Sequence, residues 1–180
     1  MLKLTVELVY SAASVLCATT GALYDVRSRR VPNFLTLPAI LFGLLLHFSI
    51  GGWGQLGSAA AAGVICGLIF LVFHLAGGMG AGDVKLITAV GCIAGLPQIG
   101  HLLILTSLAG GVMAIGLSLY RRRFKETMVN MGALVIHHRT AGLAPHPELH
   151  VGNARTLRLP YALAIATGSA LSFFLLAVQR

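Results

Sequence analysis

The sequence contains only two aspartates, and each lies at the end of a long apolar run. Asp25 stands in the segment Tyr-Asp-Val-Arg, and Asp83 follows a stretch with four glycines in six residues, 77–82. An acid close to the membrane interior is costly, so its presence there points to contact with water or to a function. Two carboxylates in a partly desolvated site share a proton, and one then acts as base while the other acts as acid. The first hypothesis is therefore paired acid chemistry at a membrane face.

Charge alone leaves a structural explanation of the two acids open. Both could be hydrated at helix ends and paired with nearby bases, Arg27 and Lys85. The glycines favour a site, because Gly80 and Gly82 let one backbone segment approach another closely beside Asp83. Two such carboxylates with a water between them can hydrolyse a peptide bond without a metal or a covalent intermediate.

The composition is that of a membrane protein. The chain has 180 residues, of which 57% are hydrophobic and 10% charged, with a mean hydropathy of +0.87. Soluble domains carry about 25% charged residues. We therefore expect the lipid bilayer as a partner. We read the net charge of +8 as a topology signal and expect no nucleic acid partner.

The apolar runs predict an all-α polytopic protein, a six-transmembrane-helix bundle that forms one membrane-embedded domain over residues 1–180. The fourth run is too short to cross the hydrocarbon alone unless its flanks extend it. The expected spans are 4–23, 34–50, 56–76, 83–97, 98–119 and 159–178.

The distribution of basic residues predicts the orientation. The segments 24–33, 77–85 and 121–158 hold three, one and seven of the thirteen bases. The positive-inside rule places all three segments in the cytoplasm, with both aspartates at that face. We expect 121–158 to be a basic cytoplasmic loop, with a short amphipathic helix on the membrane surface at 128–136.

Other chemistries find little support in the sequence. The glycine-rich stretch lacks the Lys-Ser/Thr ending of a phosphate-binding loop, and no His-Glu-x-x-His is present. Three widely spaced cysteines predict buried side chains without a disulfide or zinc site. We expect His47, His74 and His101, at span ends, to be interfacial. No metal and no cofactor are predicted.

Three segments resemble one known family. The segment 80–86, Gly-Ala-Gly-Asp-Val-Lys-Leu, resembles the GxGD signature of the prepilin peptidases, membrane aspartic proteases. The segment 24–33 resembles their first aspartate motif, an Asp followed by bases and Val-Pro-Asn. The segment 160–166, Pro-Tyr-Ala-Leu-Ala-Ile-Ala, is similar to the small members that serve tight-adherence (Flp) pili.

The resemblance implies a GxGD-type aspartic endopeptidase of the bacterial inner membrane, with Asp25 and Asp83 as catalytic residues facing the cytoplasm. It would remove the short basic leader from type IV prepilins or pseudopilins. Larger members also carry two Cys-x-x-Cys pairs and methylate the new N-terminus; neither pair occurs here, so no zinc is expected and methylation stays open. The implied supporting residues are Arg29, Pro32, Asn33, Gly80, Gly82 and Lys85.

Two other classes of function remain open from the residues. A small transporter with functional carboxylates would place its acids nearer mid-span and line a path with polar side chains. A non-catalytic assembly protein of a pilus or secretion system would need neither aspartate for its role. The nearly uncharged spans count against the transporter, and the intact aspartate motifs count against the assembly protein.

Overall fold

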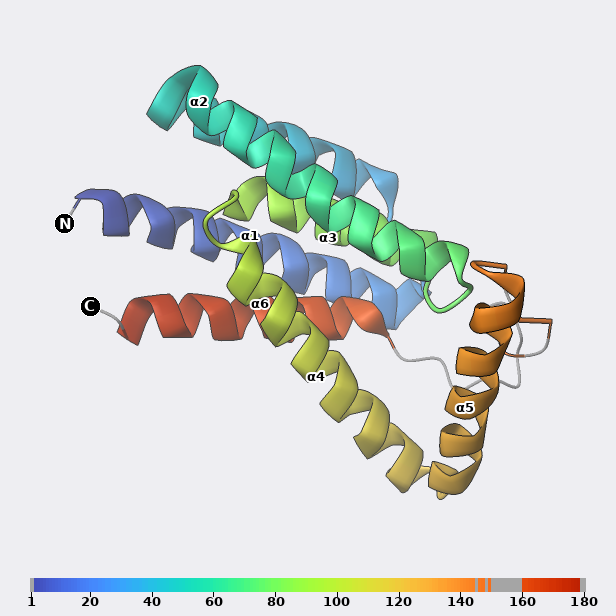
Figure 1. The fold of residues 1–180 in the computed structure, drawn as a ribbon. Helices are drawn as coiled ribbons and strands as arrows, with labels where there is room; N and C mark the ends of the chain where they lie inside the picture. Colours follow the sequence, from blue (N-terminus) through green and yellow to red (C-terminus); the bar gives the residue numbers. More distant parts are fainter. Residues whose placement is uncertain (1, 145, 148, 150–159, 179–180) are drawn as a thin grey trace.

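The computed structural model describes residues 2–144, 146–147, 149 and 160–178, and every regular element in that part of the chain is a helix. The prediction of an all-α fold is therefore confirmed. The described residues form six helices (Figure 1): α1 Leu2–Ser28, α2 Asn33–Leu75, α3 Ala81–Ala94, α4 Ile99–Tyr120, α5 Phe124–Ala141 and α6 Tyr161–Val178.

Four of these helices are long and apolar enough to cross a membrane, and they identify a multi-pass membrane protein. They are α1, α2, α4 and α6. Helix α3 is not among them, because its 14 residues rise only about 21 Å. The hydrocarbon layer of a bilayer is about 30 Å thick.

Helix α2 is divided at Gly52, where the backbone takes a positive φ of 64°. The chain doubles back there, and the two halves of α2 run in opposite directions (Figure 1). Both halves pack on α3: Gly43 of the first half meets the Cys92 carbonyl carbon, and Gly67 of the second half meets Thr88. The apolar runs at 34–50 and 56–76 thus form the two arms of a helical hairpin.

Glycines allow the helices to approach closely. A Cβ added at Gly43 would lie 2.9 Å from the backbone of Cys92 on α3, and one at Gly168 of α6 would lie 2.6 Å from the Thr106 Cα of α4. Small residues serve this purpose in lipid, where no hydrophobic force between helices replaces van der Waals packing. The crossings of α3 with α2, and of α4 with α6, depend on these positions.

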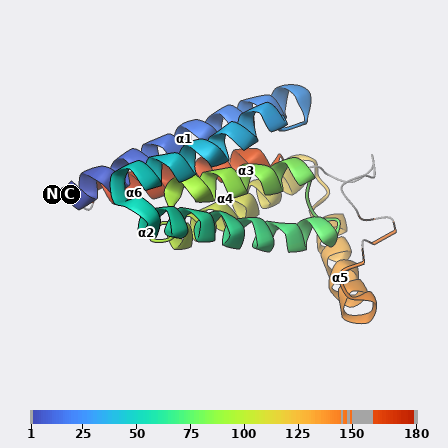
Figure 2. The same cartoon turned by 90° about the horizontal axis from the view of Figure 1, so that it is seen from above.

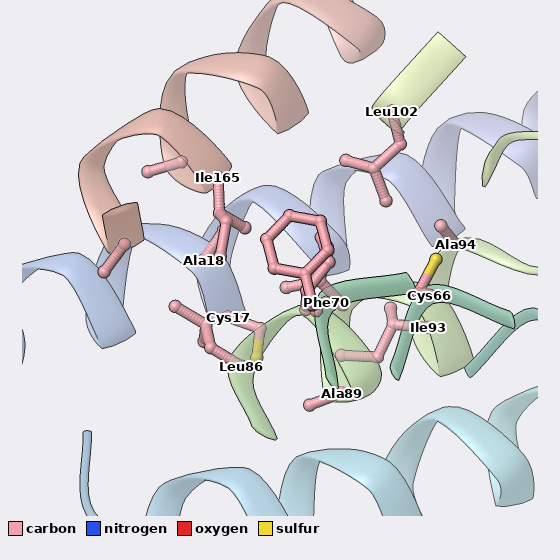
Figure 3. Packing of buried hydrophobic residues seen from close by; sticks show 14 of the residues in the cluster. Cys17, Ala18, Cys66, Phe70, Leu86, Ala89, Ile93, Ala94, Leu102 and Ile165 are labelled. Atoms are coloured by element: carbon pink, nitrogen blue, oxygen red, sulfur yellow. The ribbon is translucent and has the colours of Figure 1, made fainter. Parts of the chain in front are cut away.

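Helix α3 lies at the centre of the core. Its residues Leu86, Ile87, Ala89 and Val90 are fully buried. Figure 3 shows side chains of α1, α2, α4 and α6 packed around those of α3. The expectation that all three cysteines are buried is confirmed. The residues labelled in the figure are Cys17, Ala18, Cys66, Phe70, Leu86, Ala89, Ile93, Ala94, Leu102 and Ile165.

The first residues of α1 and the last of α6 lie at one end of the bundle, as Figures 1 and 2 show. The end of α1, the connection from α2 to α3 and helix α5 lie at the opposite end. Both aspartates therefore belong to the end that carries α5.

Two expectations about the polar segments need correction. Residues 24–33 are not all loop, because α1 continues through Asp25 to Ser28 without a helix-breaking residue. The helix expected at 128–136 is longer and spans Phe124–Ala141, with no buried residue. Of the expected loop 121–158, residues 145, 148 and 150–158 lie outside the described residues.

His47 is not interfacial as expected. Its side chain is 1% exposed and stacks on Tyr10 with ring centroids 3.8 Å apart. Its Nε2 lies 3.0 Å from the carbonyl oxygen of Ile93. The hydrophobic runs did not reveal this, because both partners of the histidine come from other helices.

Candidate active site

Asp25 is placed by the way α1 ends. The next residue out of the helix, Arg29, takes a left-handed conformation with φ 52°. Its N–H donates to the carbonyl oxygen of Asp25 over 2.7 Å. A left-handed residue at this position, usually glycine, ends many helices. Asp25 therefore stands in the last turn of α1, half-buried, just before the chain changes direction.

Asp83 is placed by the connection between α2 and α3. Gly77 has φ 79°, its N–H donates to the carbonyl oxygen of His74, and the Gly78 N–H donates to that of Phe73, both over 2.9 Å. This pair of bonds is the Schellman ending of a helix, which requires a left-handed residue and here uses Gly77. The chain then reaches Gly80, the residue that caps α3.

Asp83 lies in the first turn of α3 and is 9% exposed. Its Oδ2 accepts a hydrogen bond from the Gly80 N–H over 3.3 Å. A carboxylate at this position also complements the positive end of the helix dipole. Its Oδ1 is buried and makes no hydrogen bond with the described residues. One oxygen of Asp83 is thus held by the backbone and the other is left for a further partner.

The two aspartates line one cavity of about 280 Å³. The cavity draws its lining from the end of α1, the connection to α2 and the start of α3. It brings together six residues that the sequence analysis named as site residues and three that it did not. The lining residues are Asp25, Arg29, Arg30, Val31, Gly80, Ala81, Gly82, Asp83 and Lys85.

Burial raises the pKa of Asp83 from its ordinary value of 3.8 to about 7, and the charge of Asp25 raises it too. The Gly80 N–H, which donates to Asp83, and the nearby Ala162 N–H act in the opposite direction and lower the pKa of Asp83. The repulsion between the two carboxylates is the effect expected when two acids share a site. The cavity therefore favours a shared proton over two charges near neutral pH.

Gly82 allows the connection between α1 and α2 to lie against α3. A Cβ added at Gly82 would lie 3.3 Å from both the Cβ and the backbone nitrogen of Val31. That separation is tighter than normal packing allows without a shift of the neighbouring chain. The second glycine of the motif therefore serves a close approach of two backbones beside Asp83, as the glycine pattern suggested.

Lys85 and Asn33 connect the two segments that hold the aspartates. The Lys85 Nζ donates to the Asn33 Oδ1 over 2.9 Å. The capping residue of α2 is Pro32, whose carbonyl oxygen accepts the Leu35 N–H over 3.1 Å. Neither Pro32 nor Asn33 lines the cavity, although both follow its lining residue Val31 directly in the chain.

Neither aspartate forms an ion pair with the described residues. Between the described side chains, the one ion pair joins Arg123 and Glu126 on the surface, over 3.7 Å. Lys85 is directed to Asn33 and not to Asp83. Simple pairing of each acid with a nearby base, the structural explanation left open by the sequence, therefore does not describe this site.

The site contains residues of the motif segments that the sequence analysis did not name as site residues. Arg30, Val31 and Ala81 line it, and Ala162, in the first turn of α6, is close enough to influence Asp83. The Pro-Tyr segment at 160–166 was the available signal for α6, but sequence spacing did not show that it reaches Asp83. The described residues hold no group of three His, Cys, Asp or Glu side chains arranged for a metal.

The chain belongs to the type IV leader peptidase family, whose model matches residues 12–115, more than half of the chain, including both aspartates. It is similar to proteins named prepilin leader peptidase/N-methyltransferase. The identity is 38% over 115 residues with the one from Aeromonas hydrophila. It is 33% over 132 residues with the one from Burkholderia pseudomallei strain 1026b, and 30% over 160 residues with the one from Escherichia coli K12.

These similarities cover different shares of each chain. The Aeromonas match takes in 60% of this chain and 39% of its relative, and the Burkholderia match takes in 65% and 41%. The Escherichia match takes in 68% of this chain and 71% of the relative. This chain therefore spans about two fifths of the length of the first two. No solved structure matches it.

Proposed function

We propose that this protein is an aspartic endopeptidase that removes the short leader from type IV prepilin-like proteins of the Flp type. The observation that supports this most directly is the shared cavity of Asp25 and Asp83. The family and the names of the relatives supply the substrate class. A protease needs no more than this pair and a water to cleave a peptide bond.

In the proposed mechanism Asp25 and Asp83 hold one water and one shared proton. The ionised carboxylate takes a proton from the water, whose oxygen attacks the peptide carbonyl carbon. The protonated carboxyl donates its hydrogen bond to the carbonyl oxygen as negative charge develops there. The tetrahedral intermediate then collapses, the C–N bond breaks, and a carboxyl proton passes to the leaving nitrogen. The free Oδ1 of Asp83 is available to bind that water.

The glycine-rich start of α3 would admit the substrate backbone. Gly80, Ala81 and Gly82 line the cavity together with Asp83 and carry at most one methyl group each. An extended peptide can therefore approach the carboxylates without meeting bulky side chains. Burial of Asp83 also strengthens the interactions made with the developing charge.

The proposal places this site at the cytoplasmic face of the bacterial inner membrane. Six crossings follow if each half of α2 crosses once and α3 crosses within the bundle. The first residues of α1 and the last of α6 share one end in the structure, as an even number of crossings requires. Arg121, Arg122 and Arg123, at the end of α4, favour the cytoplasm for the opposite end.

Co-expression with an epitope-tagged Flp-type prepilin tests the proposal. The wild type is expected to convert the precursor to a shorter product on an immunoblot. Asp25→Asn and Asp83→Asn should each abolish conversion while reaching the membrane in wild-type amounts. Glu126→Gln, which removes an exposed carboxylate that does not line the cavity, is the matched control and should process normally.

One outcome would contradict the proposal, and another would invalidate the assay. Processing by both single aspartate variants would exclude the shared mechanism. Loss of processing in the Glu126→Gln control as well would show that the assay reports expression and not chemistry. A second precursor of the larger pilin type, tested in parallel, separates the Flp assignment from leader cleavage in general.

A further inference from the structure

The peptide group between Met79 and Gly80 is hydrogen-bonded at both of its polar ends. Its carbonyl oxygen, on Met79, lies 2.9 Å from the Nδ1 of His74. Its N–H, on Gly80, donates to the Oδ2 of Asp83 over 3.3 Å. A side chain of α2 is thus connected through one peptide plane to an acid of the candidate active site.

The direction of the first bond follows from its chemistry. A carbonyl oxygen only accepts, so the Nδ1 of His74 must carry the hydrogen and donate it. His74 itself is half-buried, in the last turn of α2. The Met79 side chain is 6% exposed and belongs to the core cluster. The peptide plane is therefore fixed by the histidine on one side and by a buried side chain on the other.

We propose that His74 is a positioning residue for Asp83 and acts through the Met79–Gly80 peptide group. This inference rests on the proposed role of Asp83 in peptide cleavage. A hydrogen bond accepted by the carbonyl polarises the peptide and makes its N–H a stronger donor. It also keeps the plane turned so that this N–H faces the carboxylate. His74 thus stabilises the ionised form of Asp83 without touching the substrate.

The bond from His74 acts against burial and the charge of Asp25, and in the same direction as the backbone N–H groups near Asp83. Burial and the charge of Asp25 favour the protonated acid, whereas the Gly80 and Ala162 N–H groups favour the ionised one. Loss of the histidine would make the Gly80 N–H a weaker donor to Asp83, so Asp83 would hold its proton to a higher pH. The other ionisable groups that face Asp83 or share its cavity are Asp25 from α1, Tyr161 from α6, Arg29 and Arg30 from the α1–α2 connection, and Lys85 on α3.

Carbon-13 NMR of the aspartate carboxyl carbons tests this inference directly. The sequence holds only two aspartates, so selective labelling gives two signals, and Asp25→Asn assigns them. In His74→Phe, which keeps an aromatic ring without a donor, the Asp83 midpoint should move about half a pH unit upward. In His74→Asn the side-chain N–H₂ stands where Nδ1 stood, and the midpoint should stay at its wild-type value. His101→Phe, which changes an exposed histidine in the first turn of α4, is the matched control.

An unchanged Asp83 midpoint in His74→Phe would overturn the inference, as would an equal shift in His74→Asn. If His74→Phe does not fold, His74→Leu gives the same comparison with a smaller side chain. Cleavage of the prepilin provides a second readout. His74→Phe should lower kcat about three- to tenfold with KM unchanged, and His74→Asn should restore it. The titration decides the role of His74 even if no prepilin is cleaved, so the two proposals can fail separately.

Discussion

The Lys85 Nζ donates a hydrogen bond to the Asn33 Oδ1 over 2.9 Å, and the two residues belong to the two segments that hold the aspartates. Lys85 stands one turn of α3 after the capping residue, and Asn33 is the first residue of α2. The bond therefore links the start of α2 to α3, and the cavity is lined by the connection just before α2 and by the start of α3. We infer that this bond fixes the positions of Asp25 and Asp83 relative to each other.

We expect Asn33→Ala and Lys85→Met each to lower cleavage several-fold and to have little further effect in combination. Both changes remove the same hydrogen bond, which is typically worth about 0.5–1.5 kcal/mol. A double-mutant cycle on kcat/KM should therefore give a coupling energy of that size. Arg27→Met, which removes an exposed base that does not line the cavity, is the control. Additive single effects would show that the two side chains act independently.

Gly82→Ala should reduce cleavage roughly ten- to a hundredfold while the protein still folds. The new methyl group would lie 3.3 Å from the backbone nitrogen of Val31, so the α1–α2 connection must move away from α3. Small displacements of catalytic groups produce losses of this order. Gly116→Ala on α4, where a Cβ meets nothing within 4 Å, should leave cleavage unchanged. Equal activity of the two variants would contradict the role assigned to Gly82.

The thermal stability of the protein in detergent should fall as the pH rises from about 4 to about 7. The pKa of Asp83 is raised from 3.8 to about 7 in the fold, so the native state binds a proton that the unfolded state has already lost. Its stabilising contribution is complete below pH 3.8 and disappears as the pH passes through 7. Asp83→Asn should therefore flatten the dependence of the unfolding temperature on pH.

The control for this measurement is Glu126→Gln, because Glu126 is an exposed carboxylate whose side chain is 58% accessible. Its removal should leave the pH dependence as in the wild type. A slope in Asp83→Asn as steep as in the wild type would show that burial of Asp83 does not govern stability in this pH range.

Some features of the site could be read from the sequence because they depend on neighbouring residues alone. The glycines at 77–82 predicted a break between apolar runs, and Gly77 indeed takes the left-handed conformation that ends α2. The extension of α1 past Asp25 was not predicted, because the helix ends at Arg29, a left-handed residue that is not glycine. Charged residues suggested a loop there, whereas the backbone remains helical up to Ser28.

The position of each histidine could not be predicted from its place in an apolar run. His47 is buried against Tyr10, and His74 donates to the carbonyl oxygen of Met79. Both were expected at the interface because they stand near the ends of apolar segments. The partner of His47 belongs to another helix and that of His74 to the turned loop, so only the folded arrangement brings them within reach.

The sequence by itself determined the class of protein, since the apolar runs, the placement of bases and the two aspartate motifs are properties of short segments. The tertiary structure decided that Asp25 and Asp83 line one cavity, that Lys85 binds Asn33, and that the Met79–Gly80 peptide connects His74 to Asp83. The physical reason is that these relationships depend on how closely the helices cross. Those distances are set by packing at the glycines of α2, α3 and α6, which no local pattern specifies.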